Sequence, residues 1–272
     1  MLKKRLIPVL FLKNGLIVRS QGFHDFREFG NPINQLQRLN EWLVDELVYI
    51  DITRDGQYDM KRDDHKIRVA NDVRSILIEI SRQCFMPLTF GGRIQNFEDA
   101  ARFITYGADK VVINTAAYHQ PKLITEVAKY FGSQCMVVGI DVKKEEGCYR
   151  AYVGQGTQLV ELSPEAWAKK AVDLGAGEIF LNSIDRDGSA NGYDLEIVER
   201  ISQAVSVPVI ACGGAGCFED FEDVFMKTQA SAAAAGNIFN FMENAYIRAK
   251  KHLVQKSCPV KPFVDRVFTA AS

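Results

Sequence analysis

Short apolar runs alternate with longer amphipathic segments along the chain, which predicts a repeated unit of one strand followed by one helix. The short runs carry valine and isoleucine at consecutive positions, as strands buried on both faces do. In the longer segments apolar residues recur at helical spacing, and Asn96 and Ser163 stand where N-caps belong. The predicted strands are residues 6–10, 47–52, 87–90, 111–114, 136–141, 179–182, 208–212 and 232–236. The predicted helices are residues 35–43, 65–83, 96–106, 121–131, 164–174, 195–204, 218–226 and 240–252.

This order of elements predicts an α/β fold of the (βα)8 type, a TIM barrel, because eight strand–helix units in about 250 residues are typical of it. A doubly wound open sheet is the alternative that the same pattern allows. We expect residues 1–255 to form a single barrel domain. Residues 256–272 have no hydrophobic period, so we expect a C-terminal extension there.

An internal repeat supports a barrel made of two halves. Residues 46–56 match residues 178–188 position for position, residues 87–92 resemble residues 208–214, and residues 10–13 match residues 140–143. The chain therefore reads as two units of four strands each, a twofold half-barrel repeat. A barrel of this kind suits a substrate with two similar ends.

Composition narrows the function classes. The chain has 272 residues, 33 basic and 34 acidic side chains and a net charge of −1, which argues against a general nucleic-acid binder. No apolar run approaches the roughly 20 residues that a membrane span needs, and we find no secretory signal pattern. The six cysteines and four histidines are scattered without metal-ligand spacing, so we expect a cytoplasmic protein with reduced thiols and no metal or cofactor.

Glycine pairs and amides follow several predicted strands, where barrel sites form. Gly91-Gly92 and Gly213-Gly214 could present backbone N–H groups to phosphate at related places in the two halves. Tight turns are the other explanation for such pairs. Two sets are expected to make two anion sites on opposite sides of the mouth, suited to a bisphosphate. The first set is Gly92, Asn114 and Thr115, and the second is Gly214, Gly236 and Asn237.

Carboxylates gather at the same strand ends, at Asp51, Asp141, Asp185 and Asp187. Asp141 stands at the end of the fifth predicted strand and is the candidate general base. Capping a loop or pairing with a nearby lysine is the structural alternative for it. Its partner in the repeat is Phe11, whose ring can neither donate nor accept a proton.

The opposite ends of the strands carry a second pattern of charge. Two cations and two anions stand at the starts of the first, second, fourth and sixth predicted strands: Arg5, Glu46, Lys110 and Glu178. Such a set could close into a ring of salt bridges, because buried charges must pair. From the charges alone, the favoured interpretation is that these residues stabilise the amino-terminal end of the barrel.

Several segments together resemble one family, the cyclase subunit of imidazole glycerol phosphate synthase. The resemblance covers residues 2–252 and rests on residues 45–53, 107–117, 131–135, 175–179, 183–188, 192–194 and 213–216. It implies a (βα)8 barrel that binds a two-phosphate ribonucleotide adduct across its mouth. It also implies ammonia supplied by a separate glutaminase subunit under the barrel, with imidazole glycerol phosphate and an aminoimidazole carboxamide ribotide as products.

The resemblance assigns roles to individual residues. Asp141 matches the general base and Asp187 a carboxylate beside the substrate. Asp109 matches a position that contacts the glutaminase. The two glycine and amide sets match the two phosphate sites. The four charged residues at the strand starts match the gate through which ammonia enters the barrel: Arg5, Glu46, Lys110 and Glu178. The resemblance therefore favours a functional role for this ring of charges over a purely stabilising one.

The departures from the family lie at the mouth. Phe11 stands where the family has a second catalytic Asp, and Arg93 ends a run that is usually three glycines. Loss of one acid–base partner typically costs on the order of 10²–10⁴ in rate. Three further positions differ: Arg19 replaces a lysine, Cys212 a serine and Asn182 a threonine.

The four gate residues are present, whereas one catalytic position at the mouth has lost its acid. This combination resembles one branch of the family, the second copies found with a second glutaminase and a sugar amidotransferase in surface-polysaccharide, or O-antigen, pathways. We therefore expect an ammonia-conducting subunit with doubtful cyclase activity. The first alternative is an authentic cyclase, a lyase in which Asp51, Asp185 or a water replaces the missing acid. The others are a non-catalytic bisphosphate-binding scaffold and a sugar isomerase, which would need no ammonia gate.

Overall fold

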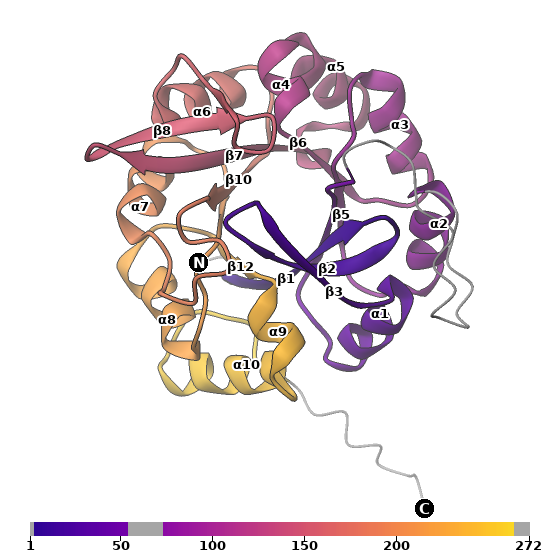
Figure 1. Ribbon diagram of the computed structural model, residues 1–272, viewed down its shortest axis with the longest axis vertical. Helices are drawn as coiled ribbons and strands as arrows, with labels where there is room; N and C mark the ends of the chain where they lie inside the picture. Colours follow the sequence, from indigo (N-terminus) through magenta and orange to yellow (C-terminus); the bar gives the residue numbers. More distant parts are fainter. Residues whose placement is uncertain (1–2, 54–72, 264–272) are drawn as a thin grey trace, which may run out of the picture.

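Eight parallel strands close into a barrel in the computed structural model, which describes residues 3–53 and 73–263 (Figure 1). Each strand pairs with the next, and β12 pairs with β1 to close the ring. This confirms the predicted (βα)8 barrel and excludes the open doubly wound sheet. In ring order the strands are β1 (Arg5–Lys13), β4 (Leu47–Asp51), β5 (Leu88–Gly91), β6 (Lys110–Ile113), β7 (Met136–Glu145), β10 (Glu178–Ser183), β11 (Val209–Cys212) and β12 (Ala232–Ala235).

Helices surround the ring and cover the outer faces of the strands (Figure 1). The predicted caps are confirmed, because the Asn96 side chain accepts from the Asp99 N–H at 2.9 Å and Ser163 Oγ from the Ala166 N–H at 3.2 Å. The outer helices are α1 (Pro32–Glu41), α2 (Val73–Gln83), α3 (Phe97–Thr105), α5 (Lys122–Phe131), α6 (Pro164–Asp173), α7 (Leu195–Ala204), α8 (Phe218–Lys227) and α10 (Ala245–Gln255). Shorter pieces are α4 (Thr115–His119), η1 (Ser133–Cys135) and α9 (Asn237–Phe241).

Some element boundaries differ from the sequence prediction. The α1 helix begins earlier than predicted, because Asn31 caps it and Pro32 occupies its first position. The helix predicted at residues 240–252 is in fact the end of α9 followed by α10, with Asn244 in a left-handed conformation between them. Residues 65–72 of a predicted helix, and residues 54–56 of the repeat, lie outside the described residues.

Two antiparallel extensions were not predicted. The β1 strand runs on beyond the barrel and pairs with β2 (Leu16–Gln21), which pairs with β3 (Asp25–Gly30). The β7 strand likewise pairs with β8 (Cys148–Val153), which is followed by β9 (Gln158–Leu159). The two extensions follow the first strand of each half-barrel, so they repeat the internal symmetry, and both lie at the carboxyl ends of the strands (Figure 1).

The inside of the barrel is apolar. Its side chains form a cluster separate from the main core between strands and helices, and β12 contributes only alanines to the ring. The cluster consists of Ile7, Val9, Val48, Val112, Val137, Phe180, Ile210, Cys212, Ala232 and Ala234.

The described chain continues past α10 along the amino-terminal end of the barrel. The Lys4 N–H donates to the Pro259 carbonyl at 2.8 Å, and Cys258 and Val260 are buried. All six cysteines are unbridged. Across residues 3–53 and 73–263 we find no helix with the length and apolar character of a membrane span.

Candidate functional site

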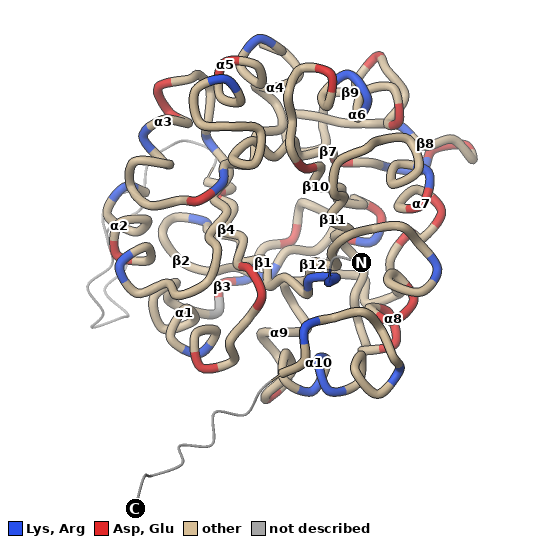
Figure 2. Tube along the Cα trace, turned by 180° about the vertical axis from the view of Figure 1, so that it is seen from behind, with Lys and Arg blue, Asp and Glu red and all other residues tan. Residues whose placement is uncertain are grey.

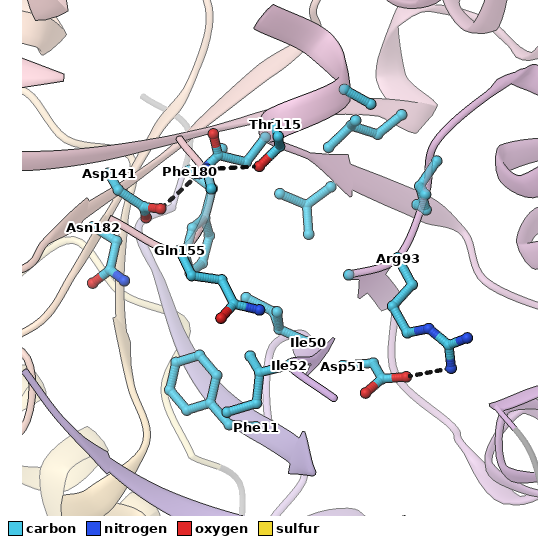
Figure 3. A pocket seen from close by; sticks show the side chains of 18 of the residues that line it. Phe11, Ile50, Asp51, Ile52, Arg93, Thr115, Asp141, Gln155, Phe180 and Asn182 are labelled. Atoms are coloured by element: carbon cyan, nitrogen blue, oxygen red, sulfur yellow. Dashed lines mark hydrogen bonds and ion pairs between the residues drawn. The ribbon is translucent and has the colours of Figure 1, made fainter. Parts of the chain in front are cut away.

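A cavity of about 610 Å³ opens at the carboxyl ends of the barrel strands. Side chains from β1, β4, β6, β7 and β10 reach it, as do the loop after β5 and the turn before β9 (Figure 3). Its walls combine apolar rings with a few polar groups. The residues that matter below are Phe11, Ile50, Asp51, Gly92, Arg93, Asn114, Thr115, Asp141, Gln155, Phe180 and Asn182.

Asp141, the predicted general base, lies on the wall of this cavity. The Asn114 side-chain amide donates to Asp141 Oδ2 at 2.7 Å, and Asn182 is the register partner of Asp141 on β10. Burial raises the pKa of Asp141 to about 7, and the nearby charge of Asp187 adds to this rise, whereas the two amides oppose it. A carboxyl group with a pKa near 7 can both accept and donate a proton at neutral pH.

Replacement of Asp141 by asparagine should change how stability depends on pH. The folded chain keeps a proton at this carboxyl up to about pH 7, whereas an aspartate with the ordinary pKa of 3.8 has lost it. The contribution of Asp141 to the free energy of unfolding of the wild type therefore falls as the pH rises from about 4 to about 7. We expect the advantage of Asp141→Asn in free energy of unfolding to grow across that window by on the order of 2 kcal/mol, measured by urea unfolding.

Asp173→Asn provides the control for this titration, because Asp173 is an exposed residue at the end of α6. This variant should keep the pH dependence of the wild type. The raised pKa of Asp141 would be refuted if Asp141→Asn followed the wild type in parallel from about pH 4 to about pH 8.

The other predicted carboxylates are held by protein groups. Asp187 is buried, and it accepts from Ser20 Oγ at 2.6 Å and from the Phe23 N–H at 3.2 Å. Burial raises the pKa of Asp187, while these donors lower it. Asp185 is exposed and accepts from the Lys144 N–H at 2.7 Å. The structure therefore brings Asp141 and Asp187 near each other, whereas Asp185 binds the β7–β8 hairpin.

The two predicted anion sets differ in position. Gly92, Asn114 and Thr115 all line the cavity. Gly92 also has a packing role, since a Cβ there would lie 2.0 Å from the Asp51 carbonyl oxygen.

The second set is Gly214, Gly236 and Asn237, and none of the three lines the cavity formed by the described residues. The Asn237 amide donates to the Ser20 carbonyl at 3.2 Å, and the Gly214 carbonyl accepts from the Gly192 N–H at 3.0 Å. The Asn237 side chain is therefore held by β2, and the Gly214 carbonyl is held by the loop before α7.

Phe11 projects into the cavity from the end of β1, across from Asp141 (Figure 3). Its register partners are Val18 on β2 and Ile50 on β4. The ring extends the apolar interior of the barrel up to the mouth. The position that the repeat pairs with Asp141 is therefore apolar.

Four charged residues form a closed ring at the opposite end of the barrel, where acidic and basic residues lie among the strand starts (Figure 2). Lys110 Nζ lies 2.9 Å from both Glu46 Oε1 and Glu178 Oε2, and Arg5 binds the same two carboxylates through its two terminal nitrogens. Thr89 Oγ1 also donates to Glu46 at 3.0 Å. The two glutamate side chains are only 2% and 6% exposed, so each depends on these partners.

Large apolar side chains are exposed at that same end. Phe85, which precedes β5, is 87% exposed, and Tyr130 at the end of α5 is 73% exposed. Asp109 is exposed beside them, with one carboxylate oxygen accepting from the Leu88 N–H at 2.8 Å. Five of the exposed large apolar residues among those described stand at or just after the carboxyl end of a helix: Leu43, Phe85, Tyr130, Met226 and Val254.

The remaining departures are scattered around the mouth. Arg19 on β2 donates to Gln21 Oε1 at 3.0 Å and lies over the Phe241 ring. Cys212 is buried at the end of β11, and burial raises the pKa of its thiol. Asn182 is the register partner of Asp141 on β10, and its amide favours the charged form of that carboxylate.

Gln155 lines the cavity but escaped the sequence analysis. It comes from the turn between β8 and β9, two strands that the sequence pattern was not used to predict. The signal was present, because buried Tyr149, Ala151 and Val153 alternate with more exposed neighbours along β8. Across residues 3–53 and 73–263 we find no group of three or more side chains that could hold a metal ion.

A closed ring of eight parallel strands with a cavity at their carboxyl ends defines a (βα)8 barrel with its candidate site where barrels of this class carry theirs. The family model described as "Histidine biosynthesis protein" matches residues 5–244. A protein named imidazole glycerol phosphate synthase subunit HisF from Halalkalibacterium halodurans is 44% identical over 265 residues, which cover 96% of this chain and 100% of that protein. A protein of the same name from Alkaliphilus metalliredigens is 42% identical over 258 residues, covering 93% and 96%. The chain therefore belongs to the histidine biosynthesis protein family, as a HisF-type member.

Proposed function

We propose that this chain is the ammonia-conducting partner of a glutaminase subunit and supplies ammonia for amidation of a sugar in surface-polysaccharide, or O-antigen, biosynthesis. Its relatives are named as subunits of a synthase, which supports an assembly of more than one chain. The observation that carries the proposal is a contrast between the two ends. The charged ring at one end is complete, whereas at the other end Phe11 stands where the family resemblance leads us to expect an acid.

The path for ammonia would run along the barrel axis. It would enter through Arg5, Glu46, Lys110 and Glu178 and continue along the apolar interior cluster. Ammonia is neutral and small, so it can cross an apolar interior that an ammonium ion would cross only at high cost. The alanines of β12 reduce side-chain volume along this route. Val112 and Phe180 belong both to the interior cluster and to the cavity wall, so the route would end in the mouth.

The glutaminase would dock at the amino-terminal end of the barrel, around the charged ring. Exposed Phe85 and Tyr130 offer apolar anchors there, and exposed aromatic side chains are enriched at protein interfaces. Asp109 lies on the same face and is the proposed polar contact. We place the complex in the cytoplasm, where six unbridged thiols would stay reduced.

Phe85→Glu should weaken the complex without unfolding the barrel. The ring is 87% exposed, so its replacement removes little intramolecular packing. Burying a new carboxylate in the interface should raise the dissociation constant at least about tenfold. Calorimetric titration of the purified glutaminase subunit into each variant measures this change.

Phe241→Glu is the matched control, because Phe241 is 61% exposed and stands in α9, at the opposite end of the barrel. It should leave the dissociation constant unchanged. Equal weakening by both substitutions, or by neither, would place the glutaminase elsewhere on the surface.

The test of the function as a whole is stimulation of the partner. Glutamine hydrolysis by the glutaminase subunit is measured alone, with this chain, and with this chain plus a sugar amidotransferase and its sugar. We expect the chain to raise hydrolysis at least about tenfold, and amidated sugar to form only with all three proteins present. A stable complex without stimulation would overturn the proposal.

Authentic cyclisation is the second candidate function, and one observation favours it. Asp141 has a pKa near 7 and lies in an open cavity, as a working acid or base would. The proposed substitutes for the missing acid have other partners, since Asp51 accepts from the Thr53 N–H at 2.9 Å and Asp185 binds the Lys144 N–H. Turnover of the ribonucleotide adduct with ammonium salt alone would establish the cyclase. Binding without turnover, and without glutaminase stimulation, would leave a scaffold.

A further inference from the structure

Two amide oxygens at the mouth are buried without a hydrogen-bond partner, Asn114 Oδ1 and Asn182 Oδ1. Among the residues that the structure describes, Arg38 Nε is the one other buried side-chain nitrogen or oxygen in this condition. Both asparagines line the cavity, and Asn182 is only 4% exposed. Because a buried acceptor without a donor is unfavourable, these oxygens point to a ligand that brings N–H or O–H groups.

The two oxygens belong to one layer of side chains where the barrel interior meets the cavity. Asn114, Asp141 and Asn182 come from the neighbouring strands β6, β7 and β10, and Figure 3 shows Asp141 and Asn182 next to each other at the cavity wall. Asn114 and Asn182 each stand two residues beyond a member of the interior cluster, Val112 and Phe180. Since side chains alternate along a strand, this layer lies directly above the apolar interior.

Gly139 leaves space between that interior and Asp141. It stands two residues before Asp141 on β7 and lines the cavity. Its φ is not positive, so the backbone conformation does not require glycine. A Cβ atom there would lie 3.3 Å from the Asn114 Cβ and 3.5 Å from a methyl group of Val112. The absence of a side chain therefore lets a small molecule in the interior reach the carboxyl group and the amide oxygens.

The chemistry of the layer selects a small ligand with several hydrogen-bond donors. The Asn114 nitrogen already donates to Asp141 at 2.7 Å, so its oxygen is the group left to bind a ligand. A phosphate presents mainly acceptor oxygens and would be repelled. Mg²⁺ and Ca²⁺ take about six or more oxygen ligands, and within the described part of the chain we find no cluster of three side chains that could hold a metal ion. Ammonia and ammonium present N–H groups in several directions, which suits two amide oxygens and one carboxylate.

We propose that Asn114, Asp141 and Asn182 form a site that holds ammonia as an ammonium ion where the interior route ends. The Asp141 carboxyl gives its proton to the arriving ammonia, which leaves a carboxylate beside an ammonium ion, and takes the proton back when ammonia moves on. The two amide oxygens accept N–H bonds from the ion. Burial raises the pKa of Asp141 to about 7, so this carboxyl still has a proton to give at neutral pH.

The inference deepens the proposed function and rests on it, because a holding site matters only where ammonia reaches the mouth. It assigns a use to Asn182, which stands where the family resemblance leads us to expect a threonine. A site that keeps ammonia paired with Asp141 would limit its escape to solvent until the acceptor is in place.

Titration of the Asp141 carboxyl carbon by NMR tests the proposal on the full chain, with Asp141→Asn to assign the signal. The midpoint is compared in ammonium, potassium and tetramethylammonium chloride at equal ionic strength. Ammonium should lower the midpoint by at least about half a pH unit relative to tetramethylammonium, because it binds the carboxylate form. Potassium should not lower it. Equal midpoints in ammonium and tetramethylammonium, or an equal lowering by potassium, would overturn the proposal.

Two neighbouring titratable groups are controlled in the same experiment. Asp187 also raises the pKa of Asp141, and its carboxyl carbon is followed in the same spectra. Cys212 stays a neutral thiol throughout, because burial raises its pKa. An ammonium effect seen at Asp187 and not at Asp141 would place the ion elsewhere and overturn the assignment.

Substitutions at Asn182 separate binding from folding. Asn182→Leu keeps the shape but removes the unpartnered oxygen, so the difference between ammonium and tetramethylammonium should disappear. Asn182→Asp keeps an acceptor oxygen and should retain the difference, which guards against a folding defect of the leucine variant. Survival of the difference in Asn182→Leu, or its loss in Asn182→Asp, would refute the site.

Thr115→Val is the matched control, an isosteric change in the same cavity. Thr115 Oγ1 already accepts from the Gly154 N–H at 3.0 Å, so the variant should keep the full ammonium effect. These titrations use the chain and a salt alone, without glutaminase. Their failure would leave glutaminase stimulation and sugar amidation to be judged separately, and failed stimulation would leave the titration result standing.

Discussion

Phe11→Asp should raise the rate at which this chain consumes the ribonucleotide adduct when ammonium salt is supplied. The substitution places a carboxyl group at the end of β1, on the opposite side of the cavity from Asp141 (Figure 3). A positioned acid or base contributes roughly 10²–10⁴ in rate. We therefore expect turnover at least about 10² above the wild type, followed as loss of the adduct's absorbance.

Ammonium salt is the right nucleophile source for this experiment, because it bypasses the glutaminase and reports on the mouth alone. Phe11→Ala controls for the loss of the ring, since it opens the same space without adding an acid. It should leave the rate at the level of the wild type. Its Tm, compared with that of Phe11→Asp, separates the cost of the lost ring from the cost of a new carboxylate among apolar neighbours.

Three outcomes would contradict this expectation. Turnover of about one per second by the wild type would make this chain a working cyclase in which Phe11 is tolerated. Equal turnover by Phe11→Ala and Phe11→Asp would mean that the ring merely blocks the substrate. Absence of turnover in all three proteins would point to the second anion set, where the Asn237 amide binds the Ser20 carbonyl, as the larger obstacle.

The barrel itself could be predicted because its signals are local. Each strand is a short apolar run buried on both faces, and each outer helix carries an apolar stripe, so the period of every segment reveals its type. The hairpin after β1 also had a local signal that was missed. Asn14 and Gly15, with φ angles of +52° and +78°, are the residue pair that favours a two-residue hairpin turn.

The charged ring could be anticipated for the same reason, because its four members stand at the starts of strands that must meet at one end of a barrel. The hydrogen bonds that hold the side chains around the mouth could not be anticipated from the sequence. They depend on Ser20, whose hydroxyl binds Asp187 and whose carbonyl binds Asn237, at sequence separations of 167 and 217 residues. No period or spacing encodes such contacts, so only the structure reveals that the two anion sets face different surroundings.

Lys110→Met should uncouple glutamine hydrolysis from amidation. Loss of the Nζ contacts at 2.9 Å leaves Glu46 and Glu178 to share Arg5 alone, so the ring gains an uncompensated negative charge. A carboxylate without its cation would hold ammonia as ammonium, and an ion cannot cross the apolar interior cheaply. We expect the ratio of amidated sugar to hydrolysed glutamine to fall at least about tenfold in the reconstituted three-protein system.

Stability alone would not distinguish a gate from a structural layer, because removing one partner of a buried ion pair costs about 3–5 kcal/mol wherever it lies. Lys250→Met supplies the comparison. Lys250 is 2% exposed and pairs with Asp45 at 2.6 Å, yet it belongs to α10, outside the ring. Both variants should lose stability, but only Lys110→Met should lose coupling. If the two lower the coupling ratio equally, the ring stabilises the barrel and ammonia takes another route.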